Sequence, residues 1–139
     1  MAGSFASDLD AWVRKSEARM LAVSQEAAQT LAREANRPRD KGGRMPVDTG
    51  FLSNSLQGEL RQIPRGPADP PKGFNRPDWD SSPVVLAINR MQLGDDLYLG
   101  YTARYARAME ARYAFVRMAS QNWPQYVTEA AMRARQVVR

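Results

Sequence analysis

The chain has 139 residues, of which 43% are hydrophobic and 25% are charged, a size and composition typical of one folded domain with one core. It contains no histidine and no cysteine, which excludes histidine-dependent acid–base catalysis, thiol nucleophiles, disulfides and zinc–thiolate sites. The formal net charge is +5, and no glycine-rich phosphate-binding motif occurs. We therefore expect a protein that is not an enzyme, that holds no cofactor and no metal, and that acts through its surfaces.

Targeting and membrane signals are also missing from the sequence. No apolar run approaches the roughly 20 residues that a transmembrane helix needs. The first residues lack the basic segment and apolar core of a signal peptide. We expect no membrane contact, and a protein that acts in the cytoplasm or inside a particle assembled there.

Residues 1–35 predict one long helix, because apolar side chains recur at helical spacings along it. At about 1.5 Å per residue, the part from Ser7 to Ala35 is about 40 Å long, which exceeds the diameter of a small domain. Two interpretations stay open: the helix overhangs its own core, or its free part contacts another subunit. The apolar stripe consists of Leu9, Trp12, Val13, Met20, Val23, Ala27 and Leu31.

The segment 36–47 interrupts this helix and is predicted to be a mobile loop. Pro38 and the pair Gly42–Gly43 stop helix formation. A solvated linker is the simpler interpretation, and the alternative is a segment that becomes ordered against a partner or a DNA backbone. Its basic residues are Arg37, Arg39, Lys41 and Arg44, opposed by Asp40.

Residues 48–63 predict a short helix followed by a strand. Asp48 or Thr49 is expected to cap the helix start with a side-chain oxygen. Gly50 is expected to allow a close approach or an unusual backbone φ angle. Alternating side chains over Leu56–Ile63 then predict the first strand.

Residues 64–83 contain six prolines, which forbid regular structure and predict a long loop. Phe74 and Trp79 lie within it. Each aromatic side chain either anchors the loop on the domain or is presented to a neighbouring molecule. The sequence leaves both interpretations open.

Residues 84–102 predict a β-hairpin. Val84–Asn89 is a continuous apolar run with β-branched residues, typical of a buried strand. Asp96–Thr102 then returns as a second strand after a turn that contains glycine and aspartate. Together with the strand before the proline-rich loop, this predicts a small antiparallel sheet of three or more strands and an α+β fold.

Residues 103–139 predict C-terminal helices, the last of which has an apolar stripe and a basic end. From Arg104 onward there are seven arginines and two glutamates, so this part carries the whole net charge. One interpretation is a DNA-facing surface. The other is arginine at protein–protein contacts, where its bidentate geometry is favoured.

Three segments carry a family resemblance. Met45–Leu60 reads MPVDTGFLSNSLQGEL, Tyr105–Glu110 reads YARAME, and Phe115–Ala119 reads FVRMA. In this order, they resemble the motifs of the small tail-completion (neck) proteins of siphophages and gene transfer agents. The residues that would shape the motif turn and the assembly surfaces are Pro46, Asp48, Thr49, Gly50, Leu52, Ser55, Tyr105, Glu110 and Arg117.

The resemblance implies a structural subunit of a phage-like particle, assembled in the bacterial cytoplasm. Such a subunit forms a ring, commonly a hexamer, at the head–tail junction or at the upper end of the tail. Its partners would be copies of itself, the tail tube and the head connector or stopper proteins, with a passing contact to DNA in the channel. The alternative that the basic composition favours is a stand-alone DNA-binding protein.

Overall fold

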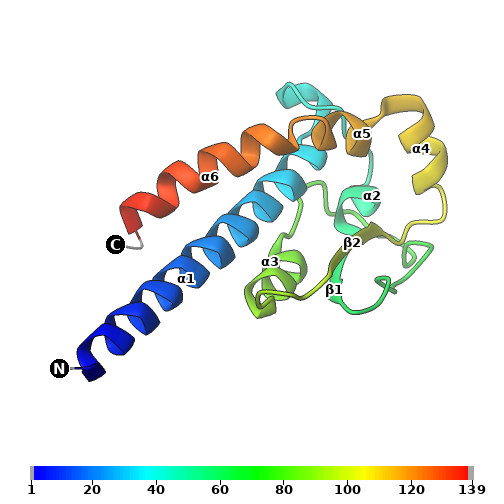
Figure 1. The fold of residues 1–139 in the computed structure, drawn as a ribbon. Helices are drawn as coiled ribbons and strands as arrows, with labels where there is room; N and C mark the ends of the chain where they lie inside the picture. The colour runs from blue at the N-terminus through cyan, green and yellow to red at the C-terminus, as the bar shows by residue number, and fades with distance from the viewer. Residues whose placement is uncertain (1, 138–139) are drawn as a thin grey trace.

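In the computed structural model, which describes residues 2–137, one long helix organises the chain (Figure 1). This helix, α1, runs from Ala2 to Ala35 and contains no proline. Its N-terminal part extends beyond all other elements, whereas its C-terminal part lies against them (Figure 1). The prediction of a single helix over residues 1–35 is confirmed for the described residues.

The remaining elements are short, and together with α1 they make an α+β fold, as predicted. The C-terminal helix is also confirmed, although Val138 and Arg139 of the predicted helix lie outside the described residues. The elements after α1 are the 3-10 turn η1 (Arg39–Lys41), α2 (Phe51–Asn54), β1 (Leu56–Leu60), α3 (Ser82–Arg90), β2 (Leu97–Tyr101), α4 (Ala106–Tyr113), α5 (Phe115–Ser120) and α6 (Trp123–Val137).

The sheet has two antiparallel strands, with Leu56 of β1 opposite Tyr101 of β2. The prediction of three or more strands is therefore wrong. The predicted hairpin over residues 84–102 is wrong as well, because β2 pairs with the distant β1 instead of a neighbour in sequence. The first strand ends at Leu60, since Arg61 adopts a left-handed backbone with φ +72°.

The predicted strand Val84–Asn89 lies inside α3. Val84 and Ala87, three residues apart, are both buried on one face of this helix. Pro83 lies in its first turn, where proline is tolerated because the N–H groups of a first turn have no partner within the helix. A short apolar run fits a buried strand or a buried helix equally by periodicity. The helix packs closely on the sheet, since a Cβ added at Gly58 would lie 2.8 Å from Cβ of Ala87.

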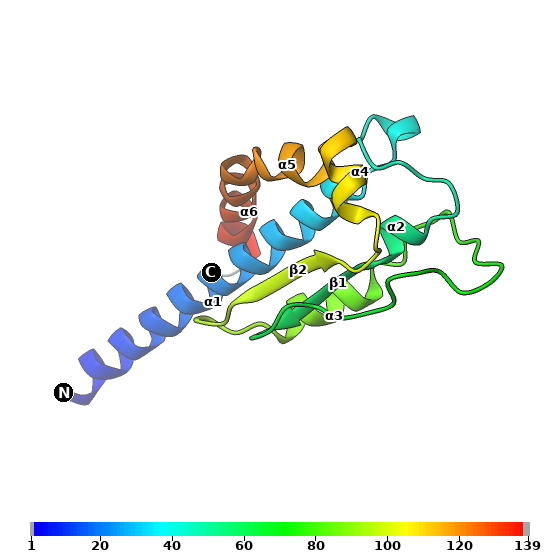
Figure 2. The same cartoon turned by 90° about the vertical axis from the view of Figure 1, so that its right-hand side faces the viewer.

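The buried core lies on both sides of the inner part of α1. On one side α6 packs along α1, with Ala27 and Ala130 fully buried and Tyr126 beside them. Small side chains at this contact let the two helix backbones approach closely, and an ion pair joins Arg133 to Glu26 across the edge. On the other side, α1 meets α3 and the sheet (Figure 2). The buried residues of that cluster are Ala28, Ala32, Leu56, Val84 and Ile88.

Both predicted loops are held by contacts. In the segment 36–47, η1 interrupts the loop, Pro38 forms a bridge with Met45, and Met45 is fully buried. In the proline-rich loop, the ring of Phe74 packs edge-on against Phe51 at 5.4 Å, and Trp79 packs against the core. The anchoring interpretation therefore holds for both aromatic residues, whereas the mobility of the loops stays a prediction. Among the described helices, none is both long and apolar enough to cross a membrane.

Candidate functional site

The motif turn before α2 requires glycine at position 50. Gly50 has φ +85°, a conformation that residues with a side chain rarely adopt. A Cβ added there would lie 1.7 Å from the carbonyl oxygen of Arg76. The proline-rich loop thus passes directly over the turn, and the Arg76 N–H donates to the carbonyl oxygen of Thr49 at 2.8 Å. The expected close approach and unusual φ at Gly50 are both confirmed.

The expected helix cap before α2 is weak. Thr49 Oγ1 accepts a long hydrogen bond of 3.4 Å from the Phe51 N–H. Asp48 makes no such bond among the described contacts, and its side chain is exposed. Partial burial and, to a smaller extent, the nearby charge of Asp48 raise the pKa of Tyr105. Asp48 therefore faces outward toward Tyr105 instead of capping the helix.

Two asparagines that the sequence interpretation did not select hold the motif in place. The Asn54 Nδ2 lies within 2.9, 3.0 and 3.1 Å of the carbonyl oxygens of Gly50, Arg76 and Asp78, and its Oδ1 accepts from the Asp80 N–H at 2.8 Å. This side chain fastens the proline-rich loop to α2. Its position in the resemblance motif was a signal that could have identified it.

The second asparagine, Asn36, lies at the end of α1 and is buried. Its Nδ2 donates to the carbonyl oxygen of Ser53 at 3.1 Å, and its Oδ1 accepts from the Tyr101 hydroxyl at 2.7 Å. A buried amide with both ends bonded fixes relative positions well, because either missing bond is costly. Asn36 thus links α1, α2 and β2.

Leu52 and Ser55 have structural positions. Leu52 is buried beneath the turn. The hydroxyl of Ser55 donates to the carbonyl oxygen of Leu52 at 2.7 Å, and the Ser55 carbonyl accepts from the Thr102 N–H at 3.1 Å. These bonds close α2 and connect it to the residue after β2.

Glu110 and Arg117 meet at the junction of α4 and α5. The chain turns there at Ala114, which has φ +55°. The Glu110 carboxylate accepts from the N–H groups of Val116 and Arg117, at 2.8 and 3.0 Å. A carboxylate at this position satisfies two unpaired donors of a helix start and interacts favourably with its dipole. Arg117 contributes its backbone to this contact, and its side chain is exposed.

An open groove forms in front of the motif turn. The motif supplies one wall, and η1, the Pro77–Asp78 part of the proline-rich loop, and Tyr105 with Met109 supply the others. It has a volume of about 850 Å³ and mixed polar and apolar walls. Of the residues that the resemblance selected, the groove is lined by Pro46, Asp48, Thr49, Gly50, Leu52 and Tyr105, whereas Ser55, Glu110 and Arg117 lie outside it.

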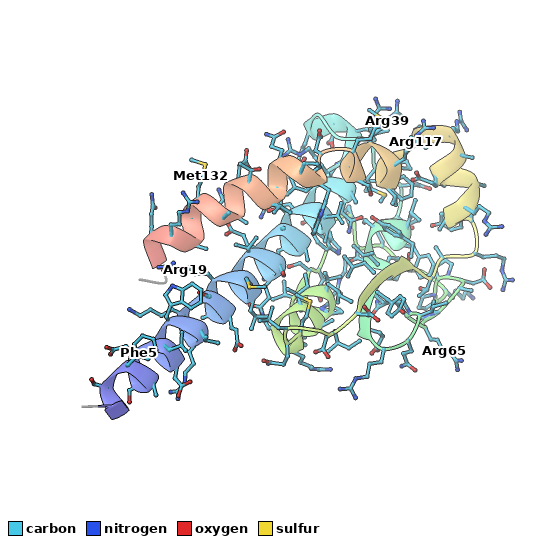
Figure 3. The ribbon with its side chains drawn as sticks, viewed as in Figure 1. Phe5, Arg19, Arg39, Arg65, Arg117 and Met132 are labelled. Atoms are coloured by element: carbon cyan, nitrogen blue, oxygen red, sulfur yellow. The ribbon has the colours of Figure 1, made fainter. Side chains whose placement is uncertain are left out.

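A second candidate surface is the arm, which we define as residues 4–20 of α1. Its large apolar side chains are exposed, with 75% of Phe5 and 64% of Trp12 accessible to solvent. Figure 3 shows Phe5 on the free part of α1, away from every other element. The helix therefore overhangs its own core, as the first interpretation expects. Whether the arm also contacts another subunit stays a prediction. The other exposed apolar residues of the arm are Leu9, Val13 and Met20.

Within residues 2–137, no group of three or more acidic side chains is placed to hold a metal ion. Comparison of the chain with protein families, with characterised proteins and with solved structures finds no match.

Proposed function

We propose that the protein is a structural subunit of a phage-like particle that forms a ring at the head–tail junction or the upper end of the tail. The observation that carries this proposal is the arm. Phe5, Leu9, Trp12 and Met20 are each more than half exposed on a helix that the chain itself leaves uncovered. A side chain of this size contributes about 1.5–3 kcal/mol when it is fully buried, so a partner that covered the arm would bind substantially.

The spatial arrangement of the resemblance motifs supports the same proposal. Residues of the first and second motif segments line the same groove, where the rings of Phe51 and Tyr105 are 6.4 Å apart. The second and third segments are joined through the Glu110 carboxylate and the N–H groups of Val116 and Arg117. Three segments that are separate in sequence therefore form one connected unit, as expected if they are parts of one motif.

The direct test is self-association. We expect the isolated protein to be a monomer in equilibrium with small oligomers, with a mass that rises with concentration in sedimentation velocity. The double substitution Leu9→Ser and Trp12→Ser should shift this equilibrium toward the monomer. Leu86→Ser with Leu93→Ser is the matched control, because both leucines are exposed outside the arm, at 55% and 41%.

Equal association of the wild type and the arm variant would contradict a role of the arm in assembly. The neighbouring genes give an independent test of the particle. We expect portal and capsid genes on one side and a tail tube gene on the other. A neighbourhood without particle genes would remove the head–tail proposal and leave a self-associating protein of another kind.

A further inference from the structure

Two basic segments that are distant in sequence converge at the end of the molecule formed by η1, α4 and α5. The guanidinium carbon of Arg39, in η1, lies 4.8 Å from the ring centre of Tyr113 in α4. Arg112 lies 5.3 Å from the centre of the same ring. Stacking of guanidinium groups on an aromatic face fixes their position while their remaining N–H donors stay available.

After η1 and α4, the third element that supplies a cation to this end is α5, whose start is held against α4 by the Glu110 carboxylate. Figure 3 shows Arg39 and Arg117 at this same end, with Arg65 on the opposite side of the body. We call this surface the basic end and define it by five exposed side chains: Arg39, Lys41, Arg44, Arg112 and Arg117.

The positive charge of the basic end exceeds the negative charge around it. The ion pairs found among residues 2–137 join other arginines, such as Arg37 to Glu34 and Arg104 to Asp69. Glu110 has its carboxylate oxygens engaged by the start of α5. The other carboxylates near the five cations are Asp40 in η1, and Asp48 and Asp78, which line the same groove as Arg39 and Lys41. The surface thus presents more cations than anions.

The chemistry of this surface favours a polyanion over a protein partner. Arginine is also favoured at protein interfaces, but there large apolar and aromatic side chains accompany it in the buried centre. The large side chains exposed beside these cations are Val47, Tyr105 and Val116, each less than 40% accessible, whereas Phe5 and Trp12 of the arm are 75% and 64% accessible. Arginine forks match the geometry of phosphate oxygens.

We propose that the basic end binds the phosphate backbone of duplex DNA without reading its sequence. The cations lie on the 3-10 turn and the loop just after it, at the end of α4 and in the short α5, not along one helix that could enter a major groove. This inference goes beyond the proposed assembly role, which depends on the arm and requires no contact with DNA.

The test is fluorescence anisotropy with a labelled duplex of arbitrary sequence, titrated with the full chain at several salt concentrations. If four or five phosphates are neutralised, the slope of log K against log salt is about −4, and affinity falls about 250-fold between 50 and 200 mM NaCl. The triple variant Arg39→Gln, Arg112→Gln and Arg117→Gln should bind at least about tenfold more weakly and have a slope reduced by about 2 to 3.

The matched control is Arg65→Gln, Lys72→Gln and Arg90→Gln, which removes the same charge from exposed positions outside the basic end. We expect it to retain most of the affinity. Equal losses in both variants would overturn the proposal in favour of net charge alone, as would undetectable binding at 50 mM NaCl. Equally tight binding of poly-glutamate would overturn it in favour of an acidic protein. Because DNA binding is scored separately from self-association, its failure is distinguishable from failure of the assembly proposal.

Discussion

The two halves of α1 differ in what covers them, although one apolar stripe runs through both. The inner half, residues 21–35, is covered by α6, α3 and α5 and buries Ala27 and Ala32 almost completely. The arm carries large side chains such as Phe5 and Trp12, and no described element of the chain covers them. The helix therefore has small residues where its own chain packs closely and large residues where the described chain leaves it uncovered.

This difference follows from how helices pack. Alanines at Ala27 and Ala130 allow the backbones of α1 and α6 to approach, so this contact is complete within one chain. Large side chains in an uncovered stripe gain nothing in the monomer and stabilise only a complex. The comparison predicts large effects of substitutions in the body and small effects on monomer stability in the arm.

The largest loss of stability is expected for Gly50→Val in the body. The new side chain would face the carbonyl oxygen of Arg76 and would require a φ of +85°. We expect a loss of about 3 kcal/mol or more in the free energy of unfolding, measured by urea denaturation. Gly73→Val is the matched control, because Gly73 has φ +78° but nothing within 4 Å of an added Cβ. Equal losses in the two variants would mean that the close approach contributes nothing.

The same substitution made once in each half of α1 tests the difference between the halves directly. Ala27→Leu places a larger side chain into the contact with α6, where Ala27 is fully buried, and should cost about 1–3 kcal/mol. Ala11→Leu makes the same change in the exposed arm and should alter stability by less than about 0.5 kcal/mol. Both values come from urea denaturation. A large loss at Ala11 would show that the arm is covered in the monomer.

Removing the large side chains of the arm should leave the monomer intact. For Phe5→Ser combined with Trp12→Ser, we expect a change of less than about 0.5 kcal/mol in the free energy of unfolding at concentrations where the protein is monomeric. At higher concentration the wild type should melt at a higher temperature than the variant, because self-association stabilises the folded state. Identical melting at all concentrations would contradict the proposed contact.

The sequence predicts the elements whose signals are local. The 3.6-residue periodicity identified α1 and α6, and the motif glycine identified the turn at Gly50, since both depend on residues close together in the chain. The run Val84–Asn89 wrongly predicts a strand, because periodicity in a short apolar segment does not distinguish a strand from a helix. In the structure this run forms a helix that packs on β1 at Gly58. No local sequence pattern encodes this contact.

The candidate site was predictable only in part, for the same reason. The turn residues were found from their sequence motif, but the groove also needs η1 and the proline-rich loop, which reach it through tertiary contacts. The hydrogen bonds of Asn36 to Ser53 and Tyr101 join three elements and leave no sequence pattern. The basic end likewise becomes visible once η1 packs on Tyr113.

The smallest effect is expected at the surface contact that holds the proline-rich loop to the residues after β2. Asp69 and Arg104 form an exposed ion pair at 2.8 Å, and the hydrogen bond from Arg104 lowers the pKa of Asp69 below its ordinary 3.8. A lowered carboxylate pKa stabilises the fold above the unfolded pKa, and this contribution disappears as the pH falls through the folded pKa. The wild type should therefore exceed Asp69→Asn slightly in stability near neutral pH and match it near about pH 2.

The measurement is the free energy of unfolding from urea denaturation of both proteins between about pH 7 and pH 2. Arg104→Gln provides the control, because it removes the partner while leaving the carboxylate. In that background, Asp69→Asn should no longer change the pH dependence, which isolates the pair in a double-mutant cycle. A pH-dependent difference that persists without Arg104 would assign the effect to another neighbour of Asp69. If the wild type and Asp69→Asn show no pH-dependent difference, solvent screens the ion pair completely. The loop is then held by the backbone hydrogen bond from the Arg104 N–H to the Ala68 carbonyl oxygen.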